Sequence, residues 1–159
     1  MAQERLMVGV SGVRGTIGGA LTPLIACEFG CAFGSTLGAG RTVVIGRDSR
    51  TSGPMLRNAV ASGLLASGVN VTDLGVVSTP GTALMTGKLG ADGGVIITAS
   101  HNPLPYNGIK FLRSTGNAIE ASAAAELKAR WENRDFTFAD ATAQGVESTN
   151  TKTHGEHVD

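Results

Sequence analysis

One segment of the sequence joins an apolar run to residues that could do chemistry. In GGVIITASHNPLPYNGIKFL (93–112), four apolar residues between positions 95 and 99 lead into Ser100, His101 and an Asn-Pro turn, and Lys110 follows. A serine hydroxyl is a weak nucleophile at neutral pH and needs a proton acceptor beside it, for which His101 and Lys110 are the local candidates. The same residues also fit a plain turn in which Ser100 has no chemical role.

Two further segments place cations among glycines or directly after an apolar run. SGVRGTIGG holds Arg14 between glycines, so that backbone amides there can approach an anion closely. GRDSR contributes Arg47, Asp48 and Arg50. Arg and Lys donors around a serine hydroxyl suit phosphoryl transfer, in which catalysis is mainly positioning and charge stabilisation. Arg47, Asp48 and Arg50 fit two interpretations equally: contacts to a phosphate, or a structural ion-pair cluster that fixes the loop.

Several other functions have no support in the sequence. No G-x-S-x-G elbow surrounds Ser100, and neither G-x-G-x-x-G nor G-x-x-x-x-G-K-[ST] occurs. Cys27 and Cys31 lie four residues apart without a Cys/His cluster, and they fit small apolar residues on one helix face. The 13 basic and 13 acidic residues give no net charge, which argues against nucleic acid and membrane surfaces as partners. No apolar run has the length of a signal peptide or a membrane span, so we expect a cytoplasmic protein.

Alternating strands and helices are predicted along most of the chain. The strands are continuous apolar runs, typical of a sheet buried on both faces, and the helices open on Thr-Pro or Ser-Gly-Pro. Strands are expected at 6–10, 42–46, 69–75, 94–98 and 108–112, and helices from 22 to 37, from 52 to 67, from 79 onward and over 120–134. This order predicts for residues 1–134 an α/β fold, a three-layer α/β/α sandwich with a mostly parallel mixed sheet. Because ligands of such sheets bind where parallel strands end, the three loops above are expected to share one edge.

Residues 135–159 differ in character from the rest of the chain. They are polar and show no sustained periodicity. We interpret them as a linker or as the start of a missing second domain.

Three motifs resemble one enzyme family. TASHNPLPYNGIKF closely resembles the phosphoserine loop of the α-D-phosphohexomutases, which interconvert hexose 1- and 6-phosphates. GVSGVRGTIG resembles the amino-terminal G-x-R-G segment of that family, and GRDSRTSG resembles its G-R-D-x-R segment. The motifs occur in family order and span nearly all of residues 6–134. The chain is therefore identified as a member of this family (phosphoglucomutases, phosphomannomutases and phosphoglucosamine mutases), matching its amino-terminal domain alone.

The resemblance implies a mechanism and a set of site residues. Ser100 would carry a phosphoryl group and donate it to the sugar phosphate, and the resulting hexose 1,6-bisphosphate, the family's activator, would reorient and return its other phosphate. Arg14, His101 and Lys110 would lie around the phosphoserine, with Lys110 or His101 as the proton-transfer or charge-stabilising partner. Magnesium would contact Ser100 through its phosphate oxygen. The substrate would be a hexose phosphate, and the partners would be the missing carboxy-terminal domains of the same enzyme.

The sequence also departs from the family pattern. The aspartates are scattered at positions 48, 73, 92, 135, 140 and 159, so the family's metal-binding D-G-D-x-D-R run is absent, and so are its G-E-x-S-G-H and R-x-S-G-T-E loops. We therefore expect the phosphoserine-bearing domain of a hexose-phosphate mutase, an isomerase of the intramolecular phosphotransferase type, inactive as an isolated fragment. The alternatives are a freestanding non-catalytic module that binds or regulates a full-length mutase, and a phosphatase-like activity of an exposed phosphoserine. The sequence does not distinguish between sugars.

Overall fold

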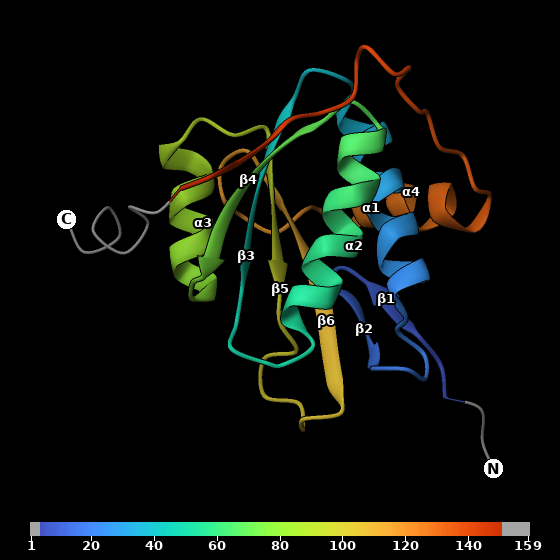
Figure 1. Cartoon of the computed structure of the whole chain (residues 1–159). Helices are drawn as coiled ribbons and strands as arrows, with labels where there is room; N and C mark the ends of the chain where they lie inside the picture. Colours follow the sequence, from blue (N-terminus) through green and yellow to red (C-terminus); the bar gives the residue numbers. More distant parts are fainter. Residues whose placement is uncertain (1–3, 151–159) are drawn as a thin grey trace.

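A mixed seven-stranded sheet with helices on both faces forms the core of the protein (Figure 1). The computed structural model describes residues 4–150, and the order of strands in the sheet is β1-β2-β6-β5-β3-β4-β7. The three-layer α/β/α architecture predicted from the sequence is confirmed. The elements are β1 (Met7–Gly9), β2 (Gly12–Thr16), α1 (Pro23–Leu37), β3 (Thr42–Arg47), α2 (Gly53–Ala66), β4 (Asn70–Val76), α3 (Thr79–Lys88), β5 (Gly93–Ile97), β6 (Tyr106–Arg113), α4 (Ala121–Glu132) and β7 (Glu147–Thr149).

The sheet is parallel on one side and antiparallel on the other. Strands β5, β3, β4 and β7 are parallel, whereas β6 runs antiparallel to both of its neighbours, β5 and β2. The reason is the length of the connections. The β5–β6 connection has no helix, and a loop of that size joins antiparallel strands, whereas parallel neighbours need a longer crossover.

The glycine-rich segment near the amino terminus was expected to be a loop, but the structure shows that part of it is a strand. The predicted strand 6–10 is shorter, and Gly12–Thr16 forms the second strand of a β1–β2 hairpin. Gly12 has a φ of 101°, and a Cβ there would lie 2.2 Å from the carbonyl oxygen of Ile109. Only glycine allows β2 to approach β6 this closely.

The helices begin near the predicted positions, but their caps differ from the prediction in two cases. Thr22 caps α1 as expected, because its hydroxyl accepts a hydrogen bond from the amide of Ile25. The cap of α3 is Ser78, one residue before the predicted Thr-Pro start. Ser52 makes no side-chain cap on α2, and its hydroxyl instead accepts a hydrogen bond from Asn107 at 2.8 Å.

The main hydrophobic core lies between the sheet and helices α1, α2 and α4. Phe29 of α1 is fully buried, its ring stacks on Trp131 of α4 with centroids 4.7 Å apart, and it also lies against Phe111 of β6. Helix α3 covers the opposite face, where Met85 packs with Val44 in a smaller core. Helix α1, predicted to be covered on more than one side, is thus enclosed by α2, α4 and the sheet.

Residues 135–150 return to this domain and extend its sheet. Strand β7 pairs in parallel with β4, and the amide of Gly145 donates to the carbonyl of Leu65 at 2.9 Å. Arg57 of α2 forms ion pairs with Asp73 of β4, at 3.3 Å, and with Glu147 of β7. No strand was predicted here, because β7 is an exposed edge strand without an apolar pattern. The remainder of the predicted linker, residues 151–159, lies outside the described part of the chain.

Membrane insertion by a helix finds no support in residues 4–150. None of the helices in this range is both long and apolar enough to cross a bilayer.

We predict that Phe29→Ala lowers the free energy of unfolding by about 3–5 kcal/mol, because it removes a fully buried ring and leaves a cavity between α1, α4 and the sheet. Urea denaturation followed by circular dichroism measures the change. The matched control is Leu24→Ala on the same helix, whose side chain is 76% exposed and whose loss should cost no more than about 0.5 kcal/mol. Equal effects of the two substitutions would contradict this description of the core.

We also predict unequal reactivity of the two thiols. Burial in α1, together with the neighbouring Cys27, raises the pKa of the Cys31 thiol to about 12, so Cys31 stays protonated where an ordinary thiol begins to ionise. At about pH 8, iodoacetamide should alkylate the part-exposed Cys27 in the folded protein and spare Cys31, with both reacting in denaturant. Peptide mass mapping measures the two rates, and equal rates in the folded protein would overturn the prediction.

Candidate active site

The Ser100 loop and the loop after β3 lie side by side at one edge of the sheet. In the parallel β3–β5 pair, Arg47 stands beside Ile97 at the ends of the two strands, and the amide of Asp48 donates to the carbonyl of Ile97 at 3.1 Å. Both loops therefore leave at the same edge, at the lower end of the view in Figure 1. This confirms for these two loops the shared edge expected from the sequence.

Ser100 has a left-handed backbone conformation at the tip of β5. Its φ is 56°, which costs a non-glycine residue about 1–2 kcal/mol, and its side chain is exposed. The Ser100 amide donates to the hydroxyl of Thr98 at 3.0 Å, and that hydroxyl donates to the Asp48 carboxylate at 2.8 Å. The turn is thus more specific than a plain Asn-Pro turn, because a hydrogen-bonded chain from the β3 loop fixes it.

The guanidinium group of Arg50 lies beneath the Ser100 loop. It donates to the carbonyl oxygens of Ser100, Asn102, Pro103 and Tyr106, at distances from 2.6 to 3.2 Å. Its Nε is 3.5 Å from the Asp48 carboxylate, and the side chain is only 14% exposed.

Arg14 and Lys110 lie on the same face of the sheet, on strands β2 and β6. Arg14 pairs with Gly108 across β2 and β6, and Lys110 is two residues further along β6, so both side chains point to the α3 side. Arg14 donates to the side-chain oxygen of Asn102 at 3.1 Å and so reaches the Ser100 loop. Lys110 lines a hollow of about 530 Å³ between β6 and α3, and its ammonium makes no hydrogen bond or ion pair within residues 4–150.

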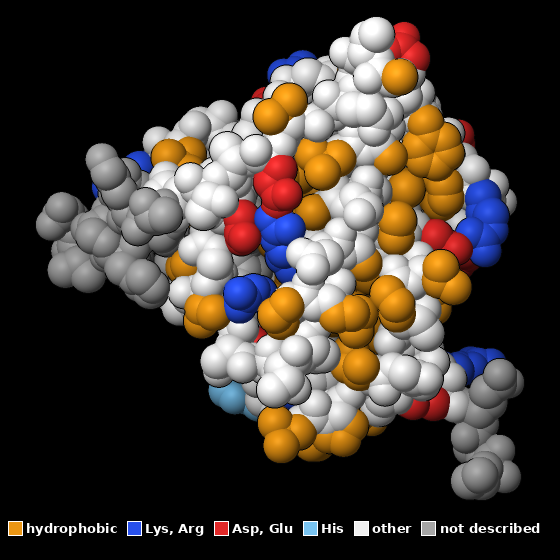
Figure 2. Space-filling model, viewed as in Figure 1, with side chains coloured by type: hydrophobic (Ala, Val, Ile, Leu, Met, Phe, Trp, Pro, Cys, Tyr) orange, Lys and Arg blue, Asp and Glu red, His pale blue; other side chains and the backbone are white. Residues whose placement is uncertain are grey.

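The side chains of the remaining predicted residues, His101 and Arg47, have no polar partner within residues 4–150. His101 is exposed on the loop, and Figure 2 shows histidine atoms at the lower edge, where the loops of Figure 1 lie. Its ring makes no hydrogen bond with any described residue. Arg47 is half-buried, and its side chain lies against the start of α2, near Gly53. Arg47 is therefore not brought to Ser100 in the way that Arg50 is.

Three further residues at this edge were not singled out in the sequence. Thr98 connects Asp48 to Ser100, Asn102 accepts from Arg14, and the fully buried Asn107 bonds to Ser52 at 2.8 Å. The only signal in the sequence is that Thr98, a polar residue, ends a buried apolar strand. Each has a partner fifty or more residues away along the chain, so no local pattern identifies them.

The described side chains do not form a magnesium site by themselves. In residues 4–150, no group of three or more His, Cys, Asp or Glu side chains could hold a metal ion. The carboxylate at this edge, Asp48, is engaged by Thr98 and by both the backbone amide and the side chain of Arg50. Magnesium prefers several free oxygen ligands, which this edge does not offer.

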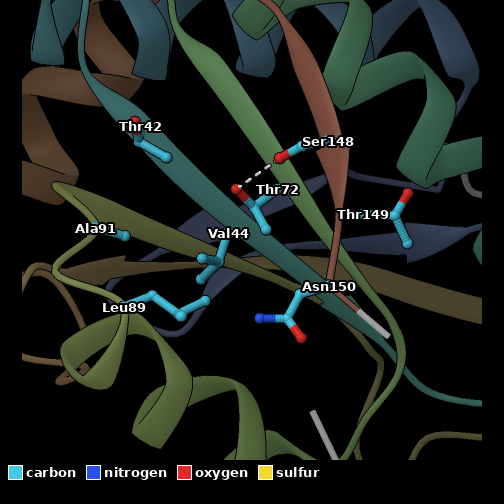
Figure 3. Close-up of a pocket in the computed structure, with 8 residues that line it drawn as sticks. All are labelled: Thr42, Val44, Thr72, Leu89, Ala91, Ser148, Thr149 and Asn150. Carbon is cyan, nitrogen blue, oxygen red and sulfur yellow. Dashed lines mark hydrogen bonds between the residues drawn. The ribbon is translucent and has the colours of Figure 1, made fainter. Parts of the chain in front are cut away.

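A separate hollow lies toward the opposite ends of the strands (Figure 3). It has a volume of about 410 Å³, and a hydroxyl pair, Thr72 and Ser148, 3.3 Å apart, spans one wall. Its lining is Thr42, Val44, Thr72, Leu89, Ala91, Ser148, Thr149 and Asn150. No charged residue is among them, so this hollow lacks the donors that phosphoryl chemistry needs.

We predict that Ser100→Gly is more stable than Ser100→Ala by about 1 kcal/mol, because glycine adopts a positive φ without the steric cost of a Cβ. Urea denaturation of the two variants measures the difference. Ser114, an exposed loop serine without a positive φ, provides the control pair. There the glycine variant should be the less stable one, by about 0.4–1 kcal/mol. The same sign at both positions would show that the Ser100 conformation is not the cause.

Comparison with known proteins assigns the chain to a family. Residues 5–138 match the family described as phosphoglucomutase/phosphomannomutase, alpha/beta/alpha domain I. Among curated proteins, the chain is 40% identical over all 159 residues to a "Probable phosphoglucosamine mutase" of Methanobrevibacter smithii, of which it covers 36%. It is 43% identical over 143 residues, 87% of its length, to the phosphoglucosamine mutase of Brevibacillus brevis, of which it covers 32%.

A solved structure has the same fold. The phosphoglucomutase/phosphomannomutase family protein of Burkholderia thailandensis superposes with a TM-score of 0.79 at 33% identity, over 94% of this chain and 35% of that one. The chain therefore spans about a third of the length of these relatives. The chain belongs to the phosphoglucomutase/phosphomannomutase family and contains its α/β/α domain I.

Proposed function

We propose that this chain is the phosphoserine-bearing part of a hexose-phosphate mutase, in which Ser100 alternately accepts and donates a phosphoryl group. The observation that carries this proposal is the exposed Ser100 in a strained, hydrogen-bonded turn that Arg14 contacts through Asn102, with Lys110 on the same face of the sheet as Arg14. A strained backbone conformation is characteristic of functional sites, because the surrounding structure must maintain it at a cost.

The proposed transfer step is a substitution at phosphorus. Oγ of Ser100 attacks a phosphorus atom of the sugar bisphosphate, so that a new O–P bond forms while the bond from phosphorus to the sugar oxygen breaks. The Ser100 proton passes to the local acceptor, either the His101 imidazole or Lys110 in its neutral amine form, and that acceptor returns the proton to the departing sugar oxygen. In the other half of the cycle, phosphorylated Ser100 donates its phosphoryl group to the free hydroxyl of a sugar monophosphate, and the resulting bisphosphate reorients so that its other phosphoryl group returns to Ser100.

Arg14 and Lys110 have an electrostatic role in this proposal. The phosphoryl group carries negative charge on its peripheral oxygens throughout the transfer, and fixed cations beside it lower the barrier. Arg14 has donors left beyond its bond to Asn102, and Lys110 makes no ion pair with a described residue. Both are therefore able to bind a phosphoryl oxygen.

The sugar and the rest of the machinery are assigned at the level of a class. Relatives reported above are named phosphoglucosamine mutase, and a protein of Thermococcus kodakarensis, 43% identical over 134 residues, is named phosphoglucomutase/phosphomannomutase. The substrate that we propose is accordingly a hexose or hexosamine phosphate. Because the described residues do not fit magnesium alone, we place its remaining ligands, and the sugar contacts, outside residues 4–150.

We predict that Ser100→Ala abolishes labelling of the complete enzyme, of which this chain is the proposed phosphoserine-bearing part, by glucose 1,6-bisphosphate that carries radioactive phosphorus, because the acceptor oxygen is gone. The matched control Ser114→Ala removes an exposed serine from another loop, and this variant should be labelled like the unsubstituted enzyme. Lys110→Ala should slow labelling by at least about a hundredfold, as the loss of a fixed donor to a phosphoryl oxygen does.

A second comparison separates the two roles open to Lys110. Lys110→Arg keeps the positive charge but cannot accept a proton, since arginine stays protonated in proteins. Retained labelling in Lys110→Arg would assign proton acceptance to His101, and lost labelling would assign it to Lys110. Labelling of Ser100→Ala at the original rate would overturn the proposed function.

A further inference from the structure

We propose that Arg50 is a positioning residue for Ser100 and does not bind the phosphoryl group itself. This inference rests on the proposed function for its catalytic meaning, but its structural content stands on the described contacts alone. The sequence left two roles open for Arg50, a phosphate contact or a structural ion pair. The geometry favours neither in its simple form, because the main partners of Arg50 are backbone carbonyls of the reactive loop.

The first argument is that the two terminal nitrogens of the guanidinium group have no donor left. Arginine carries five N–H donors, two on each terminal nitrogen and one on Nε. One terminal nitrogen bonds to the carbonyls of Pro103 and Tyr106, and the other to those of Ser100 and Asn102. The Nε faces Asp48 at 3.5 Å. A phosphate could bind Arg50 only by displacing part of the loop that carries the nucleophile.

The second argument concerns the direction of the peptide groups. In a trans peptide the carbonyl and the following N–H point in opposite directions, and the structure has no cis peptide bond. Because the carbonyls of Ser100 and Pro103 point at Arg50, the amides of His101 and Leu104 point away from it. Neither amide has an acceptor within residues 4–150. By binding these carbonyl oxygens, which would repel an anion, Arg50 holds them on the side of the loop away from the proposed anion site. The amides of His101 and Leu104 on the other side of the loop are then free to donate to an anion.

The third argument is that both sides of Ser100 are held at once. Its carbonyl accepts from Arg50, and its amide donates to Thr98, which donates to Asp48. Asp48 also accepts from the backbone amide of Arg50 at 3.0 Å, so one short loop supplies both constraints. These bonds offset the cost of the left-handed conformation, about 1–2 kcal/mol for a serine.

Lysine cannot replace arginine in this arrangement. Its ammonium has three donors on one atom, whereas the four carbonyls need the broad planar fork of a guanidinium. Arg50→Lys therefore keeps the charge and removes the positioning, which makes it a sharper variant than Arg50→Ala.

The test is a measurement of loop motion by ¹⁵N relaxation in the 159-residue chain. In the original protein we expect backbone order parameters of about 0.85 for residues 99–102 and for Leu104, and below about 0.6 in Arg50→Lys and Arg50→Ala. The amides of β5 should keep their order parameters and shifts, which shows that the variants are folded. The matched control is Arg41→Lys. The Arg41 side chain is 60% exposed and forms an ion pair with Asp92, so this substitution should leave the loop rigid.

The labelling experiment with glucose 1,6-bisphosphate then separates the two proposals. A rigid loop in a folded Arg50→Lys protein would overturn the positioning role, and so would a mobile loop that labels at the original rate. The positioning role is supported if the loop of Arg50→Lys is mobile and its labelling is slowed at least about tenfold, while Arg41→Lys is labelled at the original rate. A complete enzyme that is never labelled, with a loop that still becomes mobile in Arg50→Lys, would refute the proposed function and leave the positioning of Ser100 established.

Discussion

The parallel pairing of β3 with β5 is the constraint on which the candidate site depends. It sets Arg47 beside Ile97 and so makes two loops, far apart in sequence, leave the sheet together. The bonds that join the Ser100 turn to the β3 loop cross this junction, including the one that Thr98 donates to Asp48 and those that Arg50 donates to the loop carbonyls. A shift of this pairing by one residue would exchange the faces of the strand side chains and separate these partners.

The rigidity of that junction comes from the core behind it. Helices α1 and α2 approach each other at glycines, since a Cβ at Gly30 would lie 2.3 Å from the carbonyl of Val60, and one at Gly63 would lie 2.3 Å from that of Cys27. The aromatic contact of Phe29 with Trp131 then fixes α4 on α1. A densely packed interior of this kind resists deformation, so the loops at its edge are built on an immobile base.

Charge is distributed unevenly although the chain has no net charge. The guanidinium group of Arg50 forms an ion pair with Asp48 and donates to four carbonyl oxygens, whereas Lys110 makes no ion pair in the described part of the chain. One cation thus organises the loop while others remain able to meet an anion. This division explains why two arginines and a lysine near one serine need not have the same role.

Much of the fold and part of the site followed from the sequence alone, because they depend on local patterns. Apolar runs and Thr-Pro starts identified most strands and helices, and three motifs identified the family and predicted Ser100, Arg14 and Lys110 as site residues. Tertiary structure alone decided the features whose partners are distant. Strand β7 forms because its backbone pairs with the edge strand β4. Strand β2 forms because Gly12 allows it to approach β6 closely. Arg50 contacts the Ser100 loop because β3 lies beside β5. A hydrogen bond spanning more than fifty residues leaves no periodic trace in either segment, so its formation is determined by the sheet that brings the two together.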